Sequence, residues 1–209
     1  MKTAILFDLD GTLLDTLADI AAGVNHTLAE MGYPLRSQEE VLRFVGNGAK
    51  WLMTCAVPEN GDADTATAKF QQYYSTHCQN LTKPYDGIPE ALRAIGEKYP
   101  IAIVSNKPDT AVKPLCAQYF PGIYAQGETP ECPRKPAPDM VLRAMAELGA
   151  ERCIYVGDSE VDVLTAKNAG VPCLSVLWGF RDRETMEAAG GTHYCERPEQ
   201  LLACIEKMV

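Results

Sequence analysis

Polar residues that could do chemistry follow three short apolar runs of the chain, at 3–7, 101–104 and 153–156. Each run reads as a buried strand of a parallel sheet, and such sheets bind their ligands outside the carboxyl ends of the strands. We therefore expect the polar residues to gather at one edge of the sheet, joined by a lysine from the loop ahead of the third run. In chain order they are Asp8, Asp10, Gly11, Thr12, Ser105, Asn106, Lys135, Asp158 and Asp162.

The four carboxylates of this set indicate a cation site. They would repel one another at one sheet edge unless a hard cation lay among them, and oxygen ligands of this kind suit Mg²⁺. Asp8 and Asp10 alternate across the end of the first strand, so they point in different directions and are able to take different roles.

The remaining residues of the set are suited to a phosphate group. Gly11 allows backbone N–H groups to approach a ligand closely, while Thr12, Ser105 and Asn106 are able to donate hydrogen bonds. Lys135 would hold a transferring group as a point charge. A nucleophile, an acid/base, a cation and several donors are what phosphoryl transfer requires, and the sequence supplies all of them.

The elements that must position these residues alternate between strands and helices after residue 82, which is typical of βαβ units with helices on both faces of a sheet. Further strands are predicted at 123–124 and 173–177. Helices are predicted at 89–98, 108–118, 138–148, 161–169 and 198–207.

Residues 16–81 carry only helical patterns, at 16–31, from Ser37 to before Gly46, at 49–56 and at 64–78. Ser37 and Glu40 form a capping-box pattern at the start of the second of these helices. We predict an α/β fold with a doubly wound, mostly parallel sheet formed by residues 1–15 and 82–209. A small helical domain, residues 16–81, is inserted after the first strand.

The ordered motifs resemble those of the haloacid dehalogenase superfamily of phosphohydrolases: DLDGT at 8–12, SN at 105–106, Lys135 and GDxxxD at 157–162. The resemblance spans the whole chain, and the helical insertion is similar to the small helical cap of that superfamily. Further stretches resemble the phosphoglycolate phosphatase-like group, although sugar phosphatases, pyrophosphatases and phosphomutases share much of the same pattern. These stretches lie at 17–20, 45–48, 106–108 and 135–138.

The resemblance implies a role for each motif residue. Asp8 would attack phosphorus to form an aspartyl-phosphate, and Asp10 would protonate the leaving oxygen and then activate water. Mg²⁺ would be held by Asp8, the backbone carbonyl of Asp10 and Asp158, with Asp162 supporting them from outside the ligand shell. Gly11, Thr12, Ser105, Asn106 and Lys135 would surround the phosphate.

Other readings remain open at this point. A sugar phosphomutase uses the same two aspartates, and a pyrophosphatase or a catalytically silent relative that only binds would share the fold. Hydrolysis of C–Cl or C–P bonds is not expected, because the families that do it lack an acid at the position of Asp10. A receiver domain is excluded, because its acids and lysine follow a different order along the chain and because it has no helical insertion.

In the helical block, Asn47 and Lys50 are candidates for substrate selection. Asn47 lies in a Gly-Asn-Gly segment that is equally a plain turn between helices, and Lys50 is equally a solvated helix residue.

Composition limits the partners of the protein. The chain has 209 residues and a formal net charge of −9, which removes the basic surface that nucleic-acid binding needs. No apolar stretch is long enough to span a membrane. The eight cysteines form no C-x-x-C pair, so a reducing cytoplasm fits best. We expect a cytoplasmic protein that acts on a small phosphorylated metabolite, with its oligomeric state left open.

Overall fold

The computed structural model describes residues 2–209, which form two compact units. The first comprises the chain up to Leu14 together with Pro84–Val209, and the second comprises Asp15–Lys83. The chain crosses between them twice, and the two crossing segments pair as the short strands β2 (Leu14–Asp15) and β3 (Lys83–Pro84).

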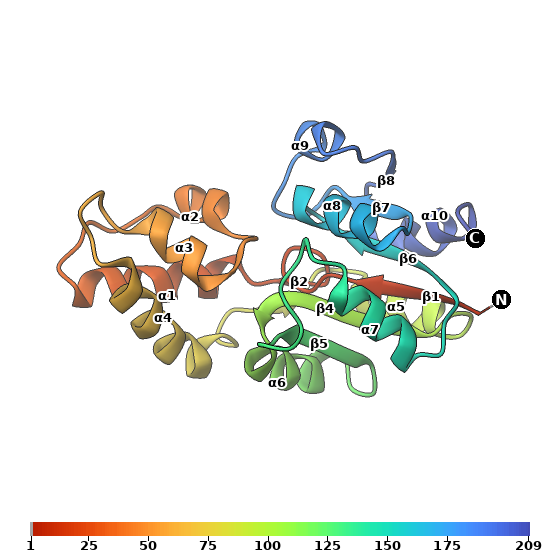
Figure 1. Ribbon diagram of the computed structural model, residues 1–209, viewed down its shortest axis with the longest axis horizontal. Helices are drawn as coiled ribbons and strands as arrows, with labels where there is room; N and C mark the ends of the chain where they lie inside the picture. Colours follow the sequence, from red (N-terminus) through yellow and green to blue (C-terminus); the bar gives the residue numbers. More distant parts are fainter. Residues whose placement is uncertain (1) are drawn as a thin grey trace. The chain divides into compact units, whose positions relative to one another are not determined.

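The first unit is built on one six-stranded sheet in which every neighbouring pair is parallel, in the order β5-β4-β1-β6-β7-β8 (Figure 1). The predicted α/β fold with a doubly wound parallel sheet is therefore confirmed. The strands are β1 (Thr3–Phe7), β4 (Ile101–Pro108), β5 (Tyr124–Glu128), β6 (Arg152–Gly157), β7 (Cys173–Val176) and β8 (His193–Cys195).

Strand β1 lies at the point where the strand order reverses, because the chain adds β4 and β5 on one side of it and then β6, β7 and β8 on the other. Open parallel sheets bind ligands at the carboxyl end of such a switch point. The residues that follow β1, β4 and β6 are therefore neighbours in space.

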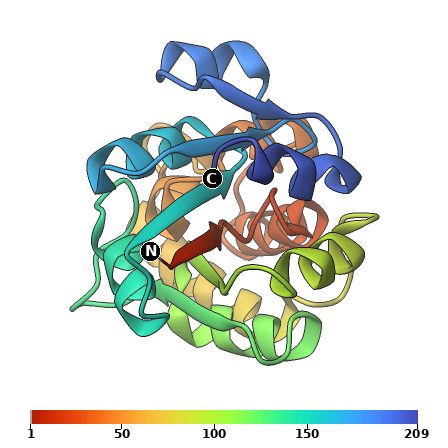
Figure 2. The same ribbon diagram turned by 90° about the vertical axis from the view of Figure 1, so that its right-hand side faces the viewer.

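Helices cover both faces of this sheet. Figure 2 shows α5 and α10 on one face, and α7 and α8 on the other. Ala4 and Leu6 of β1 pack with Met140 and Ala144 of α7 in one buried cluster. The helices of this unit are α5 (Ile88–Gly96), α6 (Asp109–Tyr119), α7 (Asp139–Glu147), α8 (Glu160–Ala169), α9 (Arg183–Ala188) and α10 (Leu201–Glu206), the last preceded by a 3-10 turn at Pro198–Gln200.

The structure adds elements that the sequence patterns did not predict. Strand β4 continues to Pro108, four residues past the predicted end, so Ser105 and Asn106 belong to the strand itself. Strand β8 and helix α9 were not predicted, because three and six residues are too short to show a clear periodicity. A local signal for α9 exists, since Asp182 caps it by accepting a hydrogen bond from the backbone N–H of Thr185.

The second unit is helical, as its pattern predicted, and consists of α1 (Leu17–Glu30), α2 (Gln38–Phe44), α3 (Gly48–Ala56) and α4 (Ala63–His77). The predicted capping box is present: Glu40 N–H donates to Ser37 Oγ over 3.2 Å, and Ser37 N–H donates to Glu40 Oε2 over 2.8 Å. Helices α1 and α4 pack closely, because Gly23 leaves room for the ring of Phe70.

A buried carboxylate ties the two ends of this unit together. Asp19, in the first turn of α1, accepts the backbone N–H groups of Leu81 and Thr82 over 2.9 and 2.8 Å, and the hydroxyl of Thr82 over 2.8 Å. The start of α1 is thereby fixed to the segment that leads into β3.

Candidate active site

Three buried carboxylates meet at the carboxyl ends of β1 and β6. Asp8, Asp158 and Asp162 each place one carboxylate oxygen within 4.8 Å of the others. Asp8 continues the ladder of β1, since its backbone N–H donates to Val156 O over 2.8 Å. The sheet itself therefore brings the first and last acidic motifs together.

Lys135 lies inside this acidic cluster. Its Nζ is 2.8 Å from Oδ1 of Asp8 and 2.8 Å from Oδ1 of Asp162, and only 2% of its side chain is exposed. Asn106 fixes its backbone, because Lys135 N–H donates to Asn106 Oδ1 over 2.6 Å and Asn106 Nδ2 donates to Lys135 O over 3.1 Å. Lys135 is therefore a buried member of the acidic cluster, and Asn106 fixes the backbone that carries it.

Asp162 has both carboxylate oxygens occupied by donors. Oδ2 accepts the backbone N–H groups of Asp158 and Ser159 over 3.2 and 3.1 Å, and the hydroxyl of Ser159 over 2.6 Å. Oδ1 accepts from Lys135 and from the hydroxyl of Tyr155, over 2.8 and 3.1 Å. Asp162 therefore orients Lys135 and the backbone of Asp158 and Ser159.

Asp158 is held in one orientation by two donors. Thr12 Oγ1 donates to its Oδ1 over 3.0 Å, and Phe180 N–H donates to its Oδ2 over 2.7 Å. Gly11 has a φ of +83°, and a Cβ at Gly11 or Gly179 would collide with the Asp158 side chain. The absence of a side chain at Gly11 thus leaves room for Asp158, and the place of Gly11 at the phosphate stays a prediction.

Burial governs the ionisation of the cluster. It raises the pKa of Asp8 well above its usual range, although Lys135 opposes the shift. Burial and the nearby Asp162 together raise the pKa of Asp158 from 3.8 to about 7. Burial alone would lower the pKa of Lys135, but Asp162 and Asp8 outweigh it and the pKa is raised. Ionised carboxylates are therefore unfavourable here without a further cation, and a bound metal ion would stabilise them.

The donor set fits Mg²⁺. Asp8 and Asp158 present carboxylate oxygens from adjacent strands, and hard oxygen donors are what Mg²⁺ prefers. No sulfur or imidazole ligand is part of this cluster. Each oxygen of Asp162 accepts at least two hydrogen bonds, whereas each oxygen of Asp158 accepts one, so Asp8 and Asp158 would be the better carboxylate ligands.

Asp10 lies outside the cluster of Asp8, Asp158 and Asp162 and contacts other residues. Its Oδ1 lies 3.1 Å from Nζ of Lys107, and its Oδ2 accepts a hydrogen bond from Ser105 Oγ over 3.3 Å. A tight turn follows, in which Gly11 N–H donates to Leu14 O over 2.9 Å. The two aspartates at the end of β1 therefore contact different lysines, Asp8 with Lys135 and Asp10 with Lys107.

The helical unit holds the other two predicted site residues. Asn47 precedes α3, and Lys50 lies on that helix, where its ammonium pairs with the carboxylate of Asp64. Their place in substrate selection stays a prediction.

Three residues at the site had no role assigned from the sequence. Lys107 contacts Asp10, Tyr155 contacts both Lys135 and Asp162, and Phe180 offers its backbone N–H to Asp158. The sequence could have indicated two of them. Lys107 follows Ser105 by two residues, and Tyr155 precedes Asp158 by three residues, on the strand that ends at the Asp158 motif.

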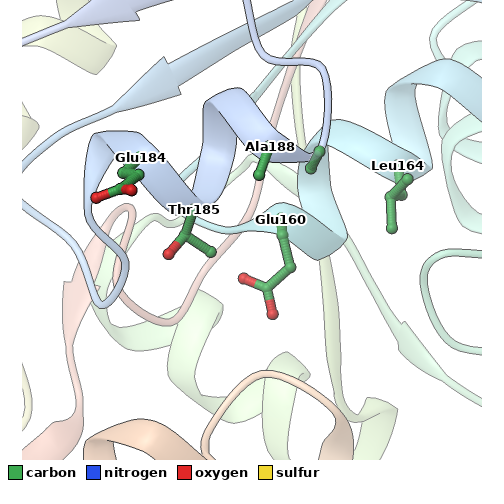
Figure 3. A pocket seen from close by; sticks show the side chains of 6 residues that line it. Glu160, Leu164, Glu184, Thr185 and Ala188 are labelled. Atoms are coloured by element: carbon green, nitrogen blue, oxygen red, sulfur yellow. The ribbon is translucent and has the colours of Figure 1, made fainter.

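A separate open pocket lies between α8 and α9 (Figure 3). The residues that line it are Glu160, Leu164, Glu184, Thr185, Ala188 and Ala189. None of them belongs to the acidic cluster, so we assign no part of the reaction to this pocket.

Sequence comparison with known proteins identifies the family. A family model described as haloacid dehalogenase-like hydrolase matches residues 5–176. Phosphoglycolate phosphatase 1 of Pseudomonas aeruginosa is 32% identical over 218 residues, covering 97% of this chain and 79% of that protein. A phosphoglycolate phosphatase of Agrobacterium fabrum is 34% identical over 197 residues, covering 87% and 83%.

Solved structures of the same fold include a similar protein. A candidate phosphoglycolate phosphatase from Lactobacillus delbrueckii subsp. bulgaricus superimposes with a TM-score of 0.92 at 33% identity, over 98% of this chain and 99% of that one. The chain belongs to the haloacid dehalogenase-like hydrolase family, as its motifs predicted. Within that family it is a phosphoric monoester hydrolase similar to the phosphoglycolate phosphatases.

Proposed function

We propose that this protein is a Mg²⁺-dependent phosphatase that hydrolyses phosphoglycolate through an aspartyl-phosphate on Asp8. One observation carries the proposal: the two carboxylates at the end of β1 have different partners. Asp8 lies in the buried cluster against Lys135, and Asp10 lies against Lys107 and Ser105. Two carboxylates in distinct environments are able to divide the roles of nucleophile and acid/base.

In this proposal Mg²⁺ is held by the carboxylates of Asp8 and Asp158 and by the backbone carbonyl of Asp10. When bound, it neutralises charge on the phosphoryl oxygens. Asp162 stays outside the ligand shell, where it orients the backbone of Asp158 and the ammonium of Lys135.

The first step transfers the phosphoryl group to the protein. A carboxylate oxygen of Asp8 forms a bond to phosphorus while the bond from phosphorus to the ester oxygen breaks. Asp10 gives its proton to that oxygen, so the leaving group departs as a neutral alcohol function.

The second step restores the protein. Asp10, now ionised, takes a proton from a water molecule as the water oxygen attacks phosphorus. The bond between phosphorus and Asp8 breaks, inorganic phosphate forms, and both aspartates return to their starting state.

The phosphoryl oxygens would be surrounded by fixed donors and by one buried cation. Donors and a cation directed at the phosphoryl oxygens stabilise the charge of the transition state. The groups proposed for this role are Gly11, Thr12, Ser105, Asn106 and Lys135.

The cellular setting and the substrate contacts are part of the same proposal. None of the described helices is long and apolar enough to cross a membrane. The eight cysteines are free, which supports a place in the reducing cytoplasm. Asn47 and Lys50 are the proposed contacts of the helical unit with the substrate.

The test is phosphate release with and without Mg²⁺ from phosphoglycolate, pyrophosphate, hexose phosphates, nucleotides and an aryl phosphate. We expect phosphoglycolate to be preferred, activity to need Mg²⁺, and Asp8→Asn to abolish turnover. Full activity in Asp8→Asn would rule out the aspartyl-phosphate. Activity that appears only after a sugar bisphosphate is added would instead identify a phosphomutase.

A further inference from the structure

Lys107 places a second buried ammonium beside the proposed acid. Its Nζ lies 3.1 Å from Oδ1 of Asp10, and only 7% of its side chain is exposed. Lys135 already serves the cluster that contains Asp8, so the phosphoryl group has a cation without Lys107. The ammonium of Lys107 is therefore available for a role other than binding the phosphoryl group.

The position of Lys107 is fixed by the end of β4. Its backbone N–H donates to Ser105 Oγ over 3.2 Å, and Ser105 Oγ donates to Asp10 Oδ2. On the other side, a Cβ at Gly127 of β5 would come within 2.6 Å of Lys107 O. This backbone is packed too closely to shift, so Lys107 and Asp10 keep their relative places.

The chemistry of the acid shows what lies near this ammonium during the reaction. Asp10 must touch the ester oxygen to protonate it, so the atoms attached to that oxygen lie next to Asp10 and Lys107. A carboxylate one carbon away from the ester oxygen would come within reach of the lysine. Burying such an anion without a charged partner would be unfavourable, and Lys107 supplies the partner.

We propose that Lys107 selects substrates whose leaving group is a short 2-hydroxycarboxylate, by pairing with the carboxylate of that group. This inference rests on the proposed phosphatase function and adds the residue that recognises the leaving group. A leaving group of the same size without the anion would offer the ammonium no carboxylate besides that of Asp10. The lysine therefore discriminates by charge, not by size.

The experiment compares two substrates that differ in one group. Phosphoglycolate carries a carboxylate where 2-hydroxyethyl phosphate carries a neutral hydroxymethyl group, and the number of heavy atoms in the chain is nearly the same. We expect the native protein to favour phosphoglycolate in kcat/KM. Replacing Lys107→Met should reduce that preference by about 10-fold to 100-fold, as expected for a lost hydrogen bond between charged groups.

Two further variants separate selection from positioning. Lys107→Gln keeps a donor for Asp10 but removes the charge, so it should lose the preference as Lys107→Met does. It replaces the Met variant in the comparison if that variant does not fold. Lys107→Arg should recover part of the preference. Lys167→Met, on the exposed side of α8, is the matched control and should behave as the native protein.

Equal losses of kcat/KM for both substrates in the Met and Gln variants would overturn the proposal, because they would mean that Lys107 only positions Asp10. A native protein that hydrolyses both substrates equally well would overturn it too, and would leave the phosphatase function standing. No phosphate release by the native protein from any ester would mean that the proposed function has failed, and this inference with it.

Discussion

The ammonium of Lys135 lies 2.8 Å from Oδ1 of Asp8, and both side chains are buried at the centre of the sheet edge. The lysine also pairs with Asp162, so one cation holds one carboxylate from the end of β1 and one from α8. Without it, the cluster would contain only negative groups. This pairing links the stability of the fold to the chemistry proposed for Asp8.

Removing that cation should destabilise the protein strongly. Lys135→Met leaves Asp8 and Asp162 buried without their partner, and breaking a buried ion pair in this way costs about 3–5 kcal/mol of unfolding free energy. Urea unfolding of the metal-free protein measures the loss.

The matched control is Lys98→Met, because Lys98 pairs with Glu206 on the exposed surface. Surface pairs contribute little, so this variant should unfold close to the native protein. Equal destabilisation by the two substitutions would contradict the importance given to the buried pair.

Asp10→Asn should slow turnover without preventing phosphoryl binding. The amide keeps the shape of the carboxylate but has no proton to give to the leaving oxygen, and loss of a general acid lowers kcat by about 100-fold or more. Steady-state kinetics on phosphoglycolate gives kcat, and an aryl phosphate with a good leaving group provides the control. Because Asp10 also activates water in the second step, the comparison uses the first turnover, in which release of the aryl alcohol should be slowed less than release of glycolate. Equal slowing of the two first turnovers would mean that Asp10 does not protonate the leaving oxygen.

Mg²⁺ should stabilise the protein more as the pH rises. The pKa of Asp158 is raised from 3.8 to about 7, so between these values the folded metal-free protein holds a proton that the unfolded chain releases. The contribution of Asp158 to the free energy of unfolding therefore falls as the pH rises through this window. Above it the carboxylate is charged and ready to bind the cation.

Thermal unfolding with and without Mg²⁺ at about pH 6 and about pH 8 checks this expectation. The increase in Tm caused by Mg²⁺ should be larger at the higher pH, and Asp158→Asn should remove most of the increase at both. An increase in Tm that is independent of pH in the native protein would show that Asp158 does not control metal binding.

Asp19→Ala should loosen the helical unit. The substitution leaves the backbone N–H groups of Leu81 and Thr82 without their acceptor, and buried donors left unsatisfied lower the unfolding free energy by roughly 2–4 kcal/mol. Denaturant unfolding measures the change, and Glu59→Ala on an exposed loop of the same unit is the control. A change no larger than that of the control would mean that Asp19 does not anchor this segment.

The sequence by itself determined the class of fold and the identity of the chemical motifs. Apolar runs of four or five residues predicted the central strands, since a strand buried on both faces must be apolar throughout. Asp8 and Asp158 were identified because each directly follows a predicted strand, and Lys135 was identified from its place in the order of the motifs. The capping box of Ser37 and Glu40 was equally readable, because it involves only local hydrogen bonds.

Only the tertiary structure decided which of these groups touch one another. The contact of Lys107 with Asp10 joins residues from different strands, and the N–H of Phe180 reaches Asp158 from the segment after β7. The division of the carboxylates between two lysines likewise depends on how β1 lies between β4 and β6. Periodicity and spacing report on neighbours along the chain, whereas pairing across a sheet is set by the packing of the whole unit.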